Sequence, residues 1–225
     1  MEQVLEFLTQ VSLNNNKPWF DAHKAAYKTA QATFNDFAIK LIEGIASFDS
    51  SVKGLGIKDC TYRFYRDLRF TKDKSPYKTH LGVFISPGGK CSCHSGYYFH
   101  IEPPDQDYLG GHLMCCGAYM PDSKQLKSIR EEFMLNGKEM VESITSAKDF
   151  YLEREDSLKM IPRGFPTDSP YSEYFKLKTA LLSRTFDNDF LFSKDLLPRT
   201  VELFKECYHF NTLINRAIDY ANEEM

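Results

Sequence analysis

Four short segments between residues 60 and 120 constrain the fold of this chain most. They begin near Cys60 and near residues 81, 96 and 112, and they are rich in the β-branched and aromatic residues that suit a pleated, half-buried surface. Turn-forming stretches separate them, without a helical pattern in between: 71–76, 87–89, 103–104 and 110–111. Strands joined directly by turns pair antiparallel, so the sequence predicts an antiparallel meander.

Helical patterns precede this region. Apolar residues recur at three- and four-residue steps over residues 2–12. A longer apolar stripe extends from Pro18 to about Ser47, and Asn16 or Lys17 would cap its first turn.

More elements follow the fourth strand. Asp122 and Gln125 form a capping-box pattern, and Gly137 divides the helix that they start from the next one. Residues 177–186 are expected to rejoin the sheet, and Ser193 to cap a final pair of helices. We therefore expect one α+β domain over residues 1–225: an antiparallel meander sheet of four to six strands, packed by N-terminal, central and C-terminal helices.

Composition narrows the functional classes. The net charge of −3 argues against broad binding of nucleic acid, which favours a strongly basic domain. No apolar run approaches the roughly 20 residues of a membrane span, and the first residues lack the pattern of a signal peptide. We expect a cytoplasmic protein whose six cysteines are reduced.

The segment 61–80 contrasts with this acidic background. Between residues 53 and 80 there are eight Lys or Arg and three Asp, a balance of +5. Alternation would place Arg66 on the apolar face of a strand, where its permanent charge needs a carboxylate, an anion or water, and Asp67 and Asp73 are near. Two interpretations stay open: Arg and Asp pair with each other, or they form a site for an anion.

The strand at residues 96–102 offers acid–base chemistry. Tyr98, His100 and Glu102 share one face at the two-residue period, and Glu102 could hold His100 in one tautomer. The alternative is a buried histidine with only a structural role. The candidate ligand-binding residues are Arg63, Arg66, Asp67, Arg69, Lys74, Tyr77, Lys78 and Tyr98, and the catalytic candidate is His100.

Seven Cys and His residues raise the question of a zinc site, which depends on their spacing. The set comprises Cys91, Cys93, His94, His100, His112, Cys115 and Cys116. The chain has no CxxC pair, and adjacent cysteines on a strand point to opposite faces, so we expect neither a metal nor a cofactor. Whether Cys91, Cys93 and His94 bind a metal stays open.

Five segments in order make the chain resemble the bacterial and fungal family catalogued as domain of unknown function 2461. They are NNNKPWFDAHKAAY at 14–27, RFYRDLRFTKDKSPYKTH at 63–80, GYYFHIEP at 96–103, GGHLMCCGAYMP at 110–121 and PRGF at 162–165. The resemblance implies one α+β domain of about this length, and it implies no activity.

The residues themselves favour a domain that binds a small anionic ligand, a carboxylate or a phosphate, through the segment 63–80. The alternative is an enzyme that acts on an anionic substrate, with His100 as the acid or base and Arg66 as the charge stabiliser. Neither interpretation involves nucleic acid or a membrane.

Overall fold

The computed structural model describes residues 1–104 and 108–223. Within them, five strands form one open antiparallel sheet in the order β1-β2-β3-β5-β4. The strands are β1 (Leu81–Ile85), β2 (Gly96–Ile101), β3 (Leu113–Ala118), β4 (Tyr151–Leu152) and β5 (Ala180–Thr185). The expected α+β class with an antiparallel meander is confirmed, since β1, β2 and β3 are neighbours both in the chain and in the sheet.

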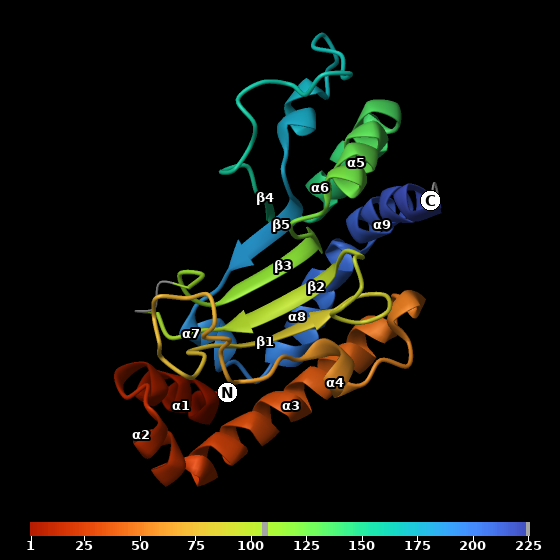
Figure 1. The fold of residues 1–225 in the computed structure, drawn as a ribbon. Coiled ribbons are helices and arrows are strands. Elements are labelled where there is room, and N and C mark those ends of the chain that lie inside the picture. Colours follow the sequence, from red (N-terminus) through yellow and green to blue (C-terminus); the bar gives the residue numbers. More distant parts are fainter. Residues whose placement is uncertain (105–107, 224–225) are drawn as a thin grey trace.

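Most of the helices come from the three regions that the sequence indicates. The helices are α1 (Glu2–Leu13), α2 (Lys17–Ala22), α3 (Lys24–Ala46), α4 (Ile57–Cys60), α5 (Ser123–Leu135), α6 (Gly137–Ser146), α7 (Asn188–Leu191), α8 (Leu196–Glu206) and α9 (Tyr208–Glu223). Of these, the short α4 and α7 lie outside the expected helices. Two short 3-10 helices, η1 (Ser50–Val52) and η2 (Ser172–Lys176), lie in connections. Figure 1 shows α3 and α8 along the sheet and α5 beside α9. No helix in the described part of the chain is both long and apolar enough to cross a bilayer.

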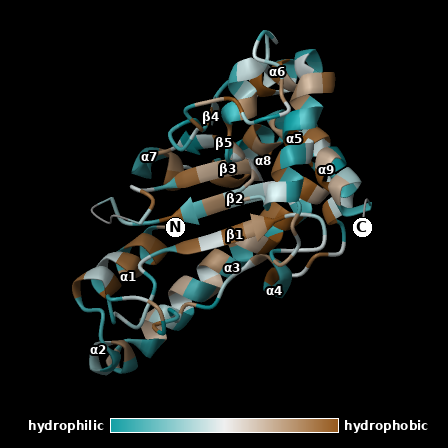
Figure 2. Cartoon of the chain, turned by 45° about the horizontal axis from the view of Figure 1, so that its top comes forward, coloured by the Kyte–Doolittle hydropathy of each residue, from teal (hydrophilic) through white to brown (hydrophobic). Residues whose placement is uncertain are grey.

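The two faces of β2 differ in character. Tyr97, Phe99 and Ile101 are buried on the face that α3 and α8 cover, where the Phe99 ring packs against Phe37 at 4.8 Å between centroids. Tyr98 and His100 lie on the opposite face, as the two-residue period predicts. Figure 2 shows mostly hydrophobic strands and a hydrophilic C-terminal end of β2. That end of the sheet therefore carries buried polar groups.

The expected long helix from Pro18 to Ser47 is divided at His23. The backbone of His23 leaves the helical region (φ −110°, ψ 19°), and its Nδ1 donates to the carbonyl oxygen of Trp19 at 2.7 Å. Its ring also stacks on the Trp19 ring, with 4.1 Å between centroids. These contacts end α2 after one and a half turns, and Asn16 caps its start as expected.

The predicted strand that begins near Cys60 is wrong. Residues 61–80 form an irregular loop whose β contacts are single bridges, Thr61 to Val83 and Tyr65 to Tyr77. Its aromatic side chains pack on the N-terminal helices instead: Phe64 lies 5.8 Å from Phe7, centroid to centroid. The aromatic pattern thus indicated burial correctly, but against helices rather than in a sheet.

Two local expectations near the later helices have different outcomes. Asp122 caps α5 and Gln125 completes the capping box, as predicted. Ser193 does not cap α8, which begins at Leu196; its Oγ accepts a hydrogen bond from the amide of Asp195 at 3.2 Å.

Candidate functional site

One end of the sheet gathers four polar side chains from separate elements. His80 immediately precedes β1, His100 lies near the end of β2, His112 precedes β3, and Asn188 begins α7 after β5. Because neighbouring strands are antiparallel, these positions meet at the same end of the sheet. Figure 1 shows the loops of this end beside α7.

A chain of hydrogen bonds runs along the second face of β2. The Tyr98 hydroxyl lies 2.8 Å from His100 Nδ1, and His100 Nε2 lies 3.3 Å from Glu102 Oε2. The carboxylate accepts a hydrogen bond from the N–H at Nε2. In neutral His100 the Nδ1 atom therefore carries no proton and accepts a hydrogen bond from the phenol. Glu102 therefore holds His100 in the tautomer whose unprotonated Nδ1 faces the Tyr98 hydroxyl. Both His100 and Glu102 are fully buried.

Glu102 also fastens the loop that follows β2. Its carboxylate accepts hydrogen bonds from the amides of Tyr108 at 3.1 Å and Leu109 at 2.9 Å. Burial alone would raise the pKa of Glu102, but the hydrogen bonds from His100 and from these amides outweigh it and lower the pKa. Glu102 is thus the fixed negative charge of the cluster.

His112 extends the network toward α7. Its Nδ1 accepts a hydrogen bond from the Glu102 amide at 3.2 Å, and its Nε2 donates to Asn188 Oδ1 at 3.0 Å. Burial lowers the pKa of His112, and nearby His100 adds to this effect. Both ring nitrogens are occupied, so His112 serves as a neutral support for Glu102.

His80 covers His100 from the loop 61–80. The centroids of the His80 and His100 rings are 4.9 Å apart. The Tyr108 ring also stacks on the His80 ring, with 4.2 Å between centroids and 9° between the planes. Burial, followed by the neighbouring His100, lowers the pKa of His80 to about 3. His80 is therefore neutral near pH 7.

The position of Tyr98 depends on a glycine in the neighbouring strand. Gly82 is the cross-strand partner of His100, and a Cβ built on it would lie 2.5 Å from the Tyr98 hydroxyl oxygen. The phenol ring consequently lies over Gly82, where its hydroxyl reaches His100. Only glycine leaves that space.

Lys78 is the cation of the loop 61–80 that is nearest to His80 in the sequence. Its Nζ lies 5.2 Å from the centre of the Tyr62 ring, and it makes no ion pair within the described residues. Burial lowers the pKa of Lys78, and the charge of Arg63 lowers it further. The positive charge of Lys78 also contributes to the lowered pKa of His80.

Three arginine candidates of the loop form ion pairs with aspartates of the same loop. Arg66 pairs with Asp73 and donates to the Ser75 carbonyl at 3.1 Å. Asp67 accepts from Arg69 at 2.6 Å and lies 3.8 Å from Arg63.

The last two candidates of this loop have structural partners. Lys74 donates to the Leu68 carbonyl at 2.9 Å. Tyr77 is a core residue, only 3% exposed, with its ring stacked on Phe20 at 4.0 Å. Among the predicted site residues, Tyr98 and His100 are in direct contact, and Lys78 lies two residues before His80, whose ring contacts His100.

Sequence reasoning did not place His80, Tyr108, His112 or Asn188 at the site. The signal for His112 was its position at the start of a predicted strand beside the one that carries His100. No local pattern indicates Asn188, which reaches the site only because β5 lies beside β3.

No cluster of three or more His, Cys, Asp or Glu side chains within the described ranges has the arrangement that a metal ion requires. The ring nitrogens of His100 and His112 contact Tyr98, Glu102 and Asn188 instead.

Comparison with protein families adds one finding. The family model described as "Conserved hypothetical protein (DUF2461)" matches residues 3–212. The chain belongs to this family. The matched range includes every residue of the site described above, from Tyr62 to Asn188. No curated protein and no solved structure matches the chain.

Proposed function

We propose that this DUF2461 protein binds a small anionic molecule at the end of the sheet and exchanges a proton with it through Tyr98, His100 and Glu102. The observation that carries the proposal is the continuous hydrogen-bond chain from the Tyr98 hydroxyl through His100 to Glu102. A chain of this kind links the hydroxyl of a partly buried tyrosine to a fixed carboxylate, which is the arrangement of an acid–base relay.

Tyr98 is the group that would touch the ligand. It keeps partial exposure to solvent, whereas His100 is fully buried and both of its ring nitrogens are engaged. When the phenol oxygen accepts a proton from the ligand, its own proton passes to His100 Nδ1, and Glu102 stabilises the imidazolium that results. Burial raises the pKa of Tyr98, so the phenol depends on His100 to take up its proton.

Lys78 would supply the positive charge that holds the anion. A cation that burial destabilises gains more from an anionic ligand than one that is already paired. This assignment replaces the expected role of Arg66, whose guanidinium contacts Asp73 and the Ser75 carbonyl.

A second candidate function is anion binding without proton transfer. The hydrogen bonds from the amides of Tyr108 and Leu109 to Glu102 favour this alternative, because through them the buried network already has a structural role. The two functions share Lys78 and differ in what Tyr98 and His100 contribute.

Binding is tested by calorimetric titration with inorganic phosphate and with a panel of small carboxylic acids, including 2-oxo acids. Lys78→Met should weaken the affinity roughly tenfold or more, since a hydrogen bond to a charged group contributes about 1.5–3 kcal/mol. Lys72→Met removes the same charge from an exposed position of the same loop and should leave the affinity unchanged. Equal affinities for wild type and Lys78→Met would contradict the site.

Proton transfer is tested with the anions that bind. Exchange of their carbon-bound protons in deuterated water is followed by NMR, and Tyr98→Phe and His100→Asn should each slow it by about a hundredfold or more while anion binding persists. Binding without any catalysed exchange in the wild type would leave the second candidate function standing alone.

A further inference from the structure

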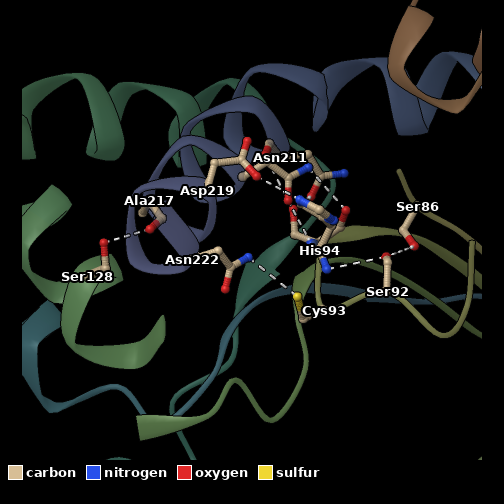
Figure 3. Close-up of polar contacts among 11 residues, drawn as sticks. Ser86, Ser92, Cys93, His94, Ser128, Asn211, Ala217, Asp219 and Asn222 are labelled. Carbon is tan, nitrogen blue, oxygen red and sulfur yellow. Dashed lines mark hydrogen bonds and ion pairs between the residues drawn. The ribbon is translucent and has the colours of Figure 1, made fainter. Parts of the chain in front are cut away.

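The loop between β1 and β2 is fastened to α9 at the other end of the sheet. Figure 3 shows the contacts: His94 Nε2 lies 2.8 Å from Asp219 Oδ1, and Ser92 Oγ lies 3.2 Å from Ser86 Oγ. In addition, the amide of Ser95 donates to the Asn215 side chain at 2.8 Å. Both ends of residues 86–95 are thus fixed, and the segment between them has a defined shape.

Two of the six cysteines lie in this segment, and they are the exposed ones. Cys91 and Cys93 are exposed, whereas the other four, Cys60, Cys115, Cys116 and Cys207, are buried. Burial raises the pKa of Cys60 to about 11 and that of Cys115 to about 12, so these thiols are poor nucleophiles near neutral pH. Thiol chemistry with a dissolved reagent is therefore confined to this loop.

Cys91 and Cys93 are separated by a single residue, which limits the distance between their Cα atoms. Residues two apart on an extended strand are separated by roughly 6.6 Å, near the upper limit of about 6.8 Å between the Cα atoms of a disulfide. Residues 91–94 form a turn and bend instead of a strand, which shortens this separation. The side chain of the intervening Ser92 contacts Ser86, with 3.2 Å between the two Oγ atoms.

Cys93 has a hydrogen-bond donor from α9 beside its sulfur. The side-chain amide of Asn222 in α9 donates to this sulfur at 3.7 Å, as Figure 3 shows. The contact holds the Cys93 sulfur in a defined position next to α9.

We propose that Cys91 and Cys93 are a reversible thiol-oxidation site that closes into an intrachain disulfide by exchange with a small disulfide such as oxidised glutathione. The Cys93 thiolate attacks one sulfur of the reagent, a mixed disulfide forms, and one glutathione thiolate leaves. The Cys91 thiolate then attacks Cys93 Sγ and releases the second glutathione. The protein loses two electrons and two protons, and the reagent becomes two thiols.

Incubation of the full chain with oxidised glutathione, followed by alkylation and mass spectrometry of peptides, tests the proposal. Wild type should lose two hydrogen atoms from the peptide that contains both cysteines and should regain them with dithiothreitol. Cys91→Ser should stop at a glutathione adduct on Cys93, because the second thiol is missing. Cys91→Ser with Asn222→Leu should form this adduct several-fold more slowly.

Three results would overturn the proposal. Wild type could retain a stable glutathione adduct, form disulfides between chains, or keep both thiols free for alkylation under conditions that oxidise a small dithiol. The double variant Cys91→Ser with Cys93→Ser should show none of the modifications, and a signal that persists in it would assign the chemistry to a buried cysteine.

Discussion

At the scale of single residues, Gly82 determines whether Tyr98 can reach His100. Alanine normally suits a strand better than glycine, so Gly82→Ala would stabilise an ordinary strand by about 0.5–1 kcal/mol. Here we expect the opposite sign, a loss of about 1–3 kcal/mol in the free energy of unfolding, because the new methyl group would overlap the phenol. Urea denaturation measures the change. In a Tyr98→Ala background the space is free, and Gly82→Ala should be neutral or stabilising; destabilisation there would show that Tyr98 is not the obstacle.

At the scale of elements, the loop 61–80 is held by the N-terminal helices rather than by the sheet. The Asn15 side chain donates to the Tyr77 carbonyl at 2.9 Å and accepts from the Tyr77 amide at 3.1 Å, as a strand partner would. Asn15→Ala should cost about 1–3 kcal/mol for the two bonds. It should also speed tryptic cleavage after Lys72 and weaken anion binding at the adjacent Lys78. Asn14→Ala, which removes only a surface bond within α1, is the matched control. Equal cleavage rates in both variants would mean that packing of Tyr77 alone holds the loop.

At the scale of the whole molecule, the features that were predicted correctly depend on residues that are close together in the sequence. The meander of β1 to β3, the Asp122 capping box and the common face of Tyr98 and His100 all follow from residues close together in the chain. The strand predicted from about Cys60 to Phe70 is wrong because aromatic residues indicate burial but not whether the partner is a strand or a helix. The predicted site lacks Asn188 because its partner is also distant in the sequence. Asn188 comes next to His112 only through the pairing of β5 with β3.

Histidines with lowered pKa values make the stability of the whole molecule depend on pH. The pKa of His80 is about 3 in the folded protein and about 6.5 in an unfolded chain. Below about pH 6.5 the unfolded state therefore binds a proton that the folded state does not, and the free energy of unfolding falls as the pH decreases. The slope from this one group is about 1.4 kcal/mol per pH unit between these limits. His112, whose pKa is also lowered, acts in the same direction. Urea denaturation of wild type and His80→Gln between pH 7 and 5, above the range in which carboxylates titrate, should give a shallower decline for the variant. Identical slopes would show that His80 is accessible to protons in the folded state.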